Sequence, residues 1–388
     1  MTKRIYLDHN ATAPVRSEAA AAVAHALTLT GNPSSVHAEG RRALALIEEA
    51  RADVAALVGA KTNEVIFTSG GTEAANLALH LAKTSLGIER LIISAIEHDC
   101  IRASAESSGL ALDSLPVDEN GVADLNALET LLAKSGKALV ALMHANNETG
   151  VIQPVAEAAA LAHAAGALLL TDTIQTVGRI TVDMKSLGAD LLLVSAHKIG
   201  GPQGTGALII RAALPYDSFI RGGGQEKRRR AGTENVSGIA GFGIAARLAR
   251  HENMSADLRN YLETELRKAV PDVRVFGEKV PRLNNTSLFA ASGLVSETLM
   301  VALDLDGLAV SAGSACSSGK VARSHVLSAM GVSDELAGAA IRVSLGRDTT
   351  KEDIDHLVAS WSRYVRRAAD KRNTNTSASS PALAEVEH

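Results

Sequence analysis

A lysine and an aspartate each follow an apolar run that is typical of a buried strand. Lys198 closes the run 191–198, which begins Leu-Leu-Leu-Val, and Asp172 follows the run 167–171. A lysine amine can form a Schiff base with an aldehyde, and a carboxylate can keep a pyridine nitrogen protonated so that the ring accepts electrons. The pair therefore predicts a site for pyridoxal 5'-phosphate, with Lys198 as the Schiff-base residue.

A glycine-rich segment further upstream is a candidate phosphate site. Residues 69–73, Ser-Gly-Gly-Thr-Glu, open a helix-like stretch that runs to Lys83. Glycines allow backbone N–H groups to approach a ligand, and a helix N-terminus favours an anion by on the order of 1 kcal/mol. Taken alone, the segment is equally well explained as a turn capped by Thr72. Beside the strand-end lysine, the phosphate interpretation is favoured.

Other polar residues have both a chemical and a structural interpretation. His98 could stack on a cofactor ring or move a proton, and Asn147 and Gln175 could hydrogen-bond a phenolic oxygen of the cofactor. Each of these three, taken alone, is better explained by an interior or capping role. Arg342 could bind a substrate carboxylate through two parallel hydrogen bonds or could form a surface salt bridge, and the sequence pattern does not separate the two.

Cys316 indicates which reaction an electron-accepting cofactor ring would serve. It lies in a loop of small residues that runs from about Ser311 to Ser324. Arms of roughly 5–8 residues could span about 17–28 Å when extended. Because the loop offers little apolar surface, we expect a mobile thiol that can enter a pocket and then present itself outside. The alternative is an inert buried cysteine, which the polar Ser/Gly surroundings disfavour.

The composition narrows the class of protein. A chain of 388 residues exceeds the size at which one core keeps growing, so two domains are expected. The net charge of -4 and the aromatic content of 3% give no case for binding to nucleic acid or membrane. Two cysteines cannot make a disulfide framework, and no run is long enough for a membrane-spanning helix, so a cytoplasmic protein is expected. The 12 histidines show no zinc-site spacing.

Short apolar runs alternate with helix-like stretches in the first 255 residues. The strand candidates are 65–68, 91–95, 139–144, 167–171, 191–195 and 207–210. Apolar strands spaced by helices predict an α/β fold with a mostly parallel sheet covered on both faces. Ligands bind such sheets outside the carboxyl ends of the strands. Five of these ends in succession carry polar or glycine-rich residues, which favours one large site.

The pattern changes beyond about residue 255. The elements expected there are a helix at 256–269, a strand at 340–345 and an amphipathic helix at 351–367. We expect a large cofactor-binding domain over 15–255 and a smaller α+β domain made of 1–14 and 256–369, which carries the Cys316 loop. The tail 370–388 is rich in Ser, Thr, Asn and Ala and lacks periodicity, so it is expected to be disordered.

Taken together, segments spread over most of the chain resemble the NifS/IscS-type cysteine desulfurases, which belong to the class V aminotransferase family of pyridoxal-phosphate enzymes with fold type I. The similar segments are 6–12, 31–35, 68–73, 97–98, 146–150, 195–198, 222–226, 230–233, 314–318 and 341–347. The resemblance implies the PLP-dependent transferase fold type I. It also implies removal of sulfur from L-cysteine, which gives L-alanine and a persulfide on Cys316.

The resemblance further implies a role for each site residue. The catalytic residues are Lys198, which carries the Schiff base, His98, which stacks on the ring and moves protons, and Cys316, which accepts sulfur. Asp172 pairs with the pyridine nitrogen, and Asn147 and Gln175 bond the phenolic oxygen. The residues that hold the phosphate are Gly71, Thr72, Ser195 and His197, joined by Thr233 from the second subunit of a homodimer. Asn32 and Arg342 bind the substrate carboxylate.

The expected partners follow from the same resemblance. Cys316 would pass its sulfur to an acceptor or scaffold protein for iron–sulfur cluster or other thio-cofactor assembly, and would contact an iron–sulfur centre transiently during the transfer. Arg323 stands where proline is common in such loops. The alternative enzymes are a selenocysteine lyase or another lyase or aminotransferase with the same cofactor. A degenerate, non-catalytic partner-binding module is a further alternative, which the joint presence of Lys198, Asp172 and Cys316 disfavours.

Overall fold

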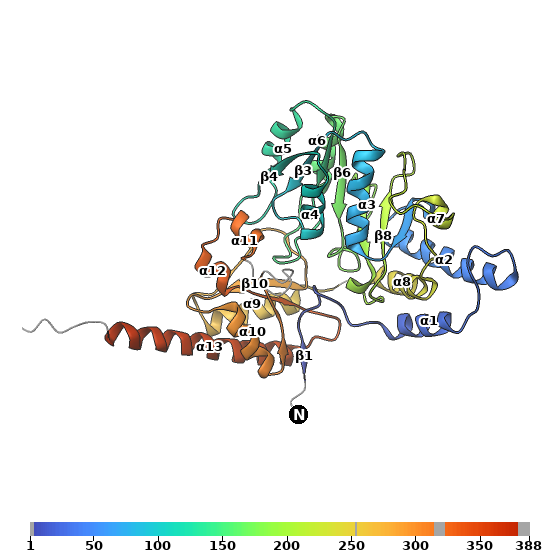
Figure 1. Ribbon diagram of the computed structural model, residues 1–388. Helices are drawn as coiled ribbons and strands as arrows, with labels where there is room; N and C mark the ends of the chain where they lie inside the picture. The colour runs from blue at the N-terminus through green and yellow to red at the C-terminus, as the bar shows by residue number, and fades with distance from the viewer. Residues whose placement is uncertain (1–3, 253, 314–322, 379–388) are drawn as a thin grey trace, which may run out of the picture.

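The computed structural model describes the backbone of residues 4–252, 254–313 and 323–378. A seven-stranded sheet with helices on both faces forms the upper part of Figure 1. A four-stranded sheet lies below it, with the helices α9 (Asp257–Ala269), α10 (Ser296–Leu305) and α13 (Lys351–Ala378). The sequence-based expectation of an α/β fold with a mostly parallel sheet and a smaller α+β part is confirmed. The domain limits remain a prediction.

The large sheet has the strand order β2-β8-β7-β6-β5-β3-β4. Its strands are β2 (Val65–Thr68), β3 (Arg90–Ser94), β4 (Ala111–Leu115), β5 (Ala138–Ala141), β6 (Leu168–Asp172), β7 (Leu191–Ser195) and β8 (Gly206–Ile210). Every neighbouring pair from β7 to β4 is parallel, whereas β8 runs antiparallel to both β7 and β2. The carboxyl ends of the parallel strands therefore meet at one edge of the sheet.

Two features of this sheet differ from what the sequence predicts. The strand β4 lies at the edge with mostly exposed side chains, so it lacks the apolar run by which the other strands were found. The run 139–144 is a regular strand only to Ala141. Beyond it, the amides of Leu142 and His144 still donate to β6, at the carbonyls of Leu170 (3.0 Å) and Asp172 (2.9 Å).

Alternate strand residues pack on opposite faces of the large sheet. In β7, Leu191 and Leu193 pack beneath α3 (Gly71–Thr84) and α4 (Asp99–Ser107). Leu192 and Val194 pack on the other face, beneath helices of the first and third quarters of the chain. Burial of one such side chain contributes about 1.5–3 kcal/mol, so the repeated Leu in β7 stabilises both layers at once.

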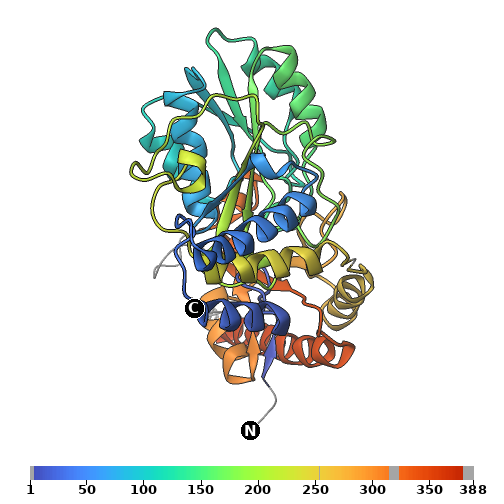
Figure 2. The ribbon, with the colours of Figure 1, turned by 90° about the vertical axis from the view of Figure 1, so that its right-hand side faces the viewer.

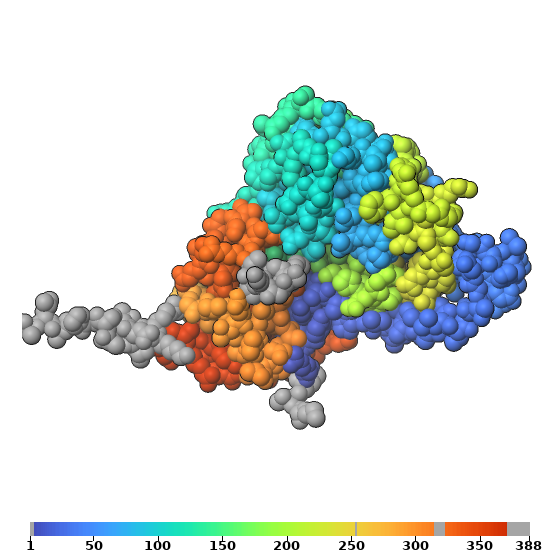
Figure 3. Space-filling model, in the orientation of Figure 1, coloured from blue at the N-terminus to red at the C-terminus, as the bar shows by residue number. Residues whose placement is uncertain are grey.

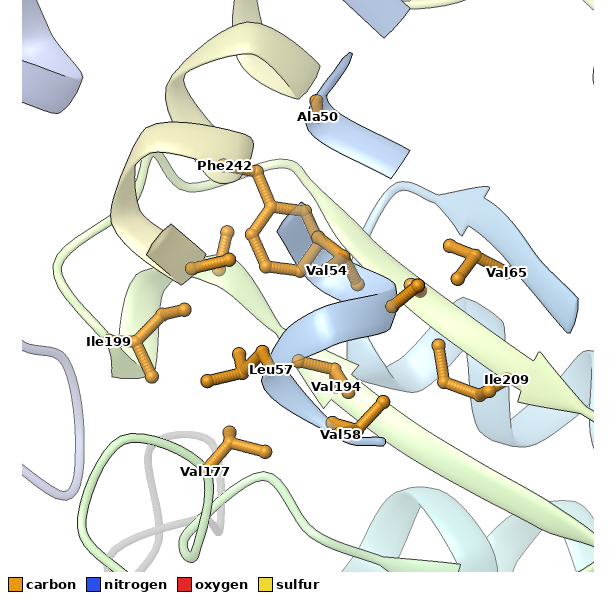
Figure 4. Packing of buried hydrophobic residues seen from close by; sticks show 14 of the residues in the cluster. Ala50, Val54, Leu57, Val58, Val65, Val177, Val194, Ile199, Ile209 and Phe242 are labelled. Atoms are coloured by element: carbon orange, nitrogen blue, oxygen red, sulfur yellow. The ribbon is translucent and has the colours of Figure 1, made fainter. Parts of the chain in front are cut away.

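The helices on the second face come from distant parts of the sequence. They are α1 (Ser17–Leu27), α2 (Ala38–Leu57), α5 (Leu125–Leu132), α6 (Val155–Ala164) and α8 (Val236–Ala249). Figure 2 shows α2 and α8 side by side in front of the sheet. Figure 4 shows how Phe242 of α8 lies near Val54 of α2 and Val194 of β7.

The smaller part has the strand order β12-β13-β10-β9. Its elements are β9 (Arg274–Val275), β10 (Thr286–Ala290), β12 (Ser311–Ala312), β13 (Ile341–Ser344), α9 (Asp257–Ala269), α10 (Ser296–Leu305), α11 (His325–Ala329), α12 (Asp334–Ala339) and α13 (Lys351–Ala378). The N-terminal strand β1 (Ile5–Tyr6) pairs in parallel with β11 (Leu308–Ala309) in a separate two-stranded sheet, which packs on the core of this smaller part. Trp361 of α13 packs edge-on against Phe289 of β10, with ring centroids 5.2 Å apart.

The last helix is longer than the sequence pattern predicts. It continues from Lys351 to Ala378, so residues 370–378 of the expected disordered tail are helical, and 379–388 lie outside the described residues. No glycine or proline stands between Lys351 and Pro381, so the sequence has no strong helix breaker at residue 370. No helix in the described ranges is long and apolar enough to cross a membrane.

Candidate active site

A cavity of about 310 Å³ lies at the carboxyl ends of the parallel strands. Ten of the residues that the sequence analysis selected line it: Gly71, Thr72, His98, Asn147, Asp172, Gln175, Ser195, His197, Lys198 and Arg342. The first nine follow or end strands of the large sheet, whereas Arg342 belongs to β13 of the smaller sheet. The cavity therefore lies between the two parts, with the large sheet providing most of the wall.

Three of the selected residues are not placed in this cavity. Asn32 is exposed and is not among the lining residues. Thr233 lines a separate pocket of about 180 Å³, together with Glu226 and Arg230. Cys316 lies outside the described residues. The structure thus assembles the predicted cofactor residues of one chain and leaves the other three to be tested by experiment.

The amine of Lys198 is held by two backbone carbonyls. Its Nζ donates to Asn10 O at 2.5 Å and to Ala11 O at 2.8 Å. Lys198 ends the short helix η2 (Ala196–Lys198), which directly follows β7. Because the two carbonyls come from the N-terminal segment, that segment positions the amine at the edge of the sheet.

Asp172 is a buried carboxylate at the last position of β6. Its Oδ1 accepts a hydrogen bond from the Ile174 amide at 2.8 Å. Burial raises the pKa of Asp172, while Ile174, His98 and Lys198 act to lower it. A buried carboxylate of this kind fits a ligand with a protonated ring nitrogen, because the positive charge would favour its ionised form.

Glycines allow close packing at the start of α3. Gly71 is the first residue of this helix, and a Cβ added there would meet Ile174 Cδ1 at 2.3 Å. A Cβ at Gly206 of β8 would meet Gly70 Cα at 2.7 Å, so only glycine lets the turn pack against the strand. Backbone N–H groups at a helix N-terminus bind phosphate, so these residues fit the phosphate of the expected cofactor.

The two histidines of the cavity have different environments. His98 is the N-cap of α4, and its Nδ1 accepts from the Cys100 amide at 3.1 Å, so the neutral ring carries its proton on Nε2. His197 Nδ1 lies 3.2 Å from Thr12 Oγ1. Burial and Lys198 lower the pKa of His197 to about 4, so this ring is neutral at neutral pH. His98 is therefore the better placed of the two to move a proton.

Arg342 is buried and retains an unused donor. It is 1% exposed, and it donates to Asp8 Oδ1 at 2.7 Å and to the Asn147 carbonyl at 3.1 Å. Its Nε is buried and has no hydrogen-bond partner among the described residues. A surface salt bridge is thus the wrong interpretation of Arg342. Because the residue lines the cavity, its guanidinium is a suitable partner for a ligand carboxylate.

Sequence reasoning missed the contribution of the N-terminal segment. Asn10 is 1% exposed, and its side chain donates to the Asn147 carbonyl at 3.1 Å and to Thr286 Oγ1 at 2.9 Å. Asp8 pairs with Arg342. The signal was a run of polar residues, Asp-His-Asn, directly after a short apolar strand. Cys100 also lines the cavity, where burial raises the pKa of its thiol.

The described parts of the chain contain no cluster of three or more His, Cys, Asp or Glu side chains that could hold a metal ion. The only metal contact expected from the sequence was a transient one at Cys316, which lies outside the described residues. That expectation remains untested.

Comparison with known proteins gives a consistent set of similarities. The model of the family described as "Aminotransferase class-V" matches residues 5–357. The cysteine desulfurase IscS of Dictyoglomus turgidum is 42% identical over 378 residues, which cover 95% of this chain and 96% of the relative. A cysteine desulfurase of Cereibacter sphaeroides is 42% identical over 365 residues, covering 92% of this chain and 94% of the relative.

A solved structure extends the similarity to three dimensions. The X-ray structure of a NifS-like protein from Rickettsia africae superposes with a TM-score of 0.85 at 37% sequence identity. The similarity covers 93% of this chain and 99% of that one.

Proposed function

The chain belongs to the aminotransferase class-V family and is a pyridoxal-phosphate-dependent cysteine desulfurase, and we propose that the cavity of Lys198 is where it removes sulfur from L-cysteine. The family resemblance, the enzyme class and the cofactor inferred from the sequence are confirmed. The observation that best supports the location is that Lys198 and Asp172 line one cavity. The alternatives, another lyase or aminotransferase and a non-catalytic partner-binding module, have no comparable support among the relatives described above.

The residues of the cavity fit the cofactor, and we propose one role for each group. Lys198 would carry the Schiff base, Asp172 would pair with the ring nitrogen, and His98 would stack on the ring. Asn147 and Gln175 would bond the phenolic oxygen. The phosphate would be bound by Gly71, Thr72, Ser195 and His197. When bound, the cofactor supplies an electron sink that stabilises negative charge on the substrate carbon.

The side chains of the site bind the substrate and move its protons. Arg342, oriented by Asp8, would bind the carboxylate of L-cysteine through its guanidinium. Asn32, which is exposed in the isolated chain, is proposed as a further carboxylate ligand. His98 Nε2 and Lys198 Nζ are the groups that would carry protons to and from the substrate.

Cys316 is proposed as the sulfur acceptor. Its thiolate would attack the substrate sulfur, so that an S–S bond forms as the substrate C–S bond breaks. The electron pair of the broken bond stays on the substrate carbon, which takes up a proton, and the product leaves as L-alanine. Cys316 keeps the persulfide until an acceptor takes it. The acceptor would be an iron–sulfur scaffold protein or another sulfur-transfer protein, which Cys316 or its bound sulfur would contact transiently.

We further propose a homodimer in which Thr233 completes the phosphate site of the second copy. Thr233 lies in a pocket separate from the cavity of its own chain, which supports a role in another chain. Exposed apolar side chains on and between α1 and α2 support an interface there, namely Leu27, Val36 and Leu44. Figure 3 shows this segment projecting from the body at one side. A thiol that must stay reduced between turnovers suits a cytoplasmic location.

Chemical trapping tests the assignment of Lys198. Borohydride reduction of the protein loaded with pyridoxal phosphate should fix the cofactor to a single peptide, the one that contains Lys198. Lys185, which lies in the connection between β6 and β7, serves as the control lysine. A label on any lysine other than Lys198 would contradict the proposed site.

A further inference from the structure

Arg179 is a buried arginine beside the cavity for which the proposed reaction provides no role. It lies between β6 and β7 and is 7% exposed. Burial and the nearby Arg342 lower its pKa to about 10, so Arg179 remains charged at neutral pH. Within the described residues, no carboxylate forms an ion pair with Arg179. A buried charge is costly, so the groups that it contacts carry information about its role.

Gln175 accepts two of the hydrogen bonds that Arg179 donates. Arg179 Nη1 donates to the Gln175 carbonyl at 2.8 Å and also to Gln175 Oε1. Its Nη2 donates to the His9 carbonyl at 3.3 Å. Gln175 lines the cavity, whereas Arg179 does not. Arg179 can therefore act on the cavity through Gln175.

The two ends of the Gln175 amide have partners of opposite character. Its Oε1 accepts a hydrogen bond from the Arg179 guanidinium, which can only donate. Its Nε2 donates a hydrogen bond, 3.1 Å long, to the Asn10 carbonyl oxygen, which can only accept. Rotation of the amide by half a turn would place NH₂ against the guanidinium and oxygen against the carbonyl. The orientation of this amide is thus fixed from both sides.

We propose that Arg179 is a positioning residue that keeps the Gln175 amide nitrogen toward the cofactor side of the cavity. The same Asn10 carbonyl accepts from Lys198 Nζ at 2.5 Å, so the Gln175 nitrogen lies on the Lys198 side. An amide nitrogen has two hydrogens, and one of them is donated to the Asn10 carbonyl oxygen, so the other remains to be donated. With the amide fixed in this way, Gln175 offers a donor, and never an acceptor, to an anionic ring oxygen of the cofactor. This inference rests on the proposed function of the cavity.

Other charged or titratable groups around Gln175 and Arg179 must stay unchanged in a test. His9 packs near Arg179, and burial together with Arg179 lowers the pKa of His9 to about 4, so it is neutral at neutral pH. The titratable or charged residues that line the cavity itself are His98, Cys100, Asp172, His197, Lys198 and Arg342. The single substitutions proposed below leave all of these in place.

The test is a pH titration of the visible absorbance of the protein loaded with pyridoxal phosphate. The midpoint of this titration is the pH at which half of the absorbance change is complete. Arg179→Met and Gln175→Ala should each raise this midpoint by about one pH unit, because an anionic oxygen without its donor binds a proton more tightly. The double variant should show no larger shift than Gln175→Ala alone. Arg179→Lys, which keeps a cationic donor, should shift the midpoint less than Arg179→Met.

Arg90→Met is the matched control. Arg90 is also buried, and it donates to the carbonyls of Leu131 at 2.8 Å and Lys134 at 3.0 Å, away from the cavity. Its loss should lower stability and leave the midpoint at the wild-type value. If Arg179→Met does not fold, Gln175→Glu replaces it, since a carboxylate has no donor for the ring oxygen and should also raise the midpoint.

Each outcome decides between the inference and its alternatives. A wild-type midpoint in Arg179→Met overturns the positioning role of Arg179. A wild-type midpoint in Gln175→Glu, where that variant is used, overturns the donor role of Gln175 and with it the positioning role that depends on it. Additive shifts in the double variant also overturn it, because they would mean that Arg179 acts directly through its charge. Failure of the wild-type protein to form any lysine-linked visible species is a different result, which would overturn the proposed function of the cavity itself.

Discussion

The hydroxyl of Ser324 donates a hydrogen bond to Glu148 Oε2, and both side chains are buried. Ser324 is the N-cap of α11, and Glu148 directly follows the cavity residue Asn147. A Cβ at Gly313 would lie 3.8 Å from the same Glu148 oxygen. Glu148 therefore lies next to both described ends of the connection that contains Cys316, close to the wall of the cavity.

Glu148 should make stability depend on pH. Burial raises its pKa to about 7, against the opposing effects of Ser324 and Arg342. The folded chain therefore keeps a proton that the unfolded chain loses above about pH 4.5, and stability falls as the pH rises from there to about 7. Glu148→Gln should remove this contribution, which is roughly 3 kcal/mol at most. Urea unfolding at pH 5, 6, 7 and 8 measures the difference.

Exposed Glu157 of α6 provides the control for this prediction. Glu157→Gln should follow the wild-type pH dependence. Glu97, whose pKa burial raises to about 8, still contributes its own pH dependence in every variant. Parallel pH curves for wild type and Glu148→Gln would show that Glu148 titrates normally in the folded chain.

A strained turn predicts a stabilising substitution. Three successive residues, Glu226, Lys227 and Arg228, have φ of 47°, 57° and 66°, which is the left-handed region that favours glycine. Lys227 is exposed, so Lys227→Gly should raise the free energy of unfolding by about 1 kcal/mol. The same change at exposed Lys268 in the helix α9 should lower it by about 1 kcal/mol. Equal losses at both positions would argue against strain.

The substrate role of Arg342 predicts a change in KM. Arg342→Lys keeps the charge but loses the planar set of donors, so the KM for L-cysteine should rise about tenfold or more while the cofactor stays bound. Steady-state alanine production gives KM, and the visible spectrum reports the cofactor. Arg282→Lys, which alters a buried arginine paired with Glu263, is the control and should leave KM unchanged. An unchanged KM in Arg342→Lys would remove the residue from the substrate site.

Subunit complementation tests the proposed homodimer. Lys198→Ala and Thr233→Ala should each have low activity when prepared alone. If Thr233 serves the partner's site, a dimer containing one chain of each kind holds one intact site, so co-expression with two different tags should restore activity. Activity no higher than that of the separate variants would place Thr233 in its own chain's site. An active particle of 40.3 kDa by light scattering would exclude the dimer altogether.

Sequence reasoning located the strands of the large sheet because most are buried on both faces and read as continuous apolar runs. It failed for β4, whose edge position exposes its side chains. It could not assign the direction of β8, since periodicity is the same for parallel and antiparallel strands. In α13 the amphipathic pattern ended before the helix did, so loss of the pattern did not mark the end of the helix.

The dependence of sequence reasoning on local patterns also explains which site residues were found. Asp172 and Lys198 were recognised because each stands where an apolar run ends, and parallel strands bring such ends together. Asn10 and Arg179 were missed because their roles depend on contacts across 188 and 170 positions, with Lys198 and His9 respectively. Such contacts form only when the N-terminal segment crosses the edge of the sheet, and a local sequence pattern does not predict that crossing.

The account depends most on Cys316 as the residue that receives the sulfur. Mass spectrometry of the protein after reaction with L-cysteine should find one additional sulfur on the peptide that holds Cys316 and none on the peptide that holds Cys100, whose pKa is raised by burial. Cys316→Ser should bind the cofactor and release almost no L-alanine. Sulfur on Cys100, or alanine released at the wild-type rate by Cys316→Ser, would contradict the proposed mechanism.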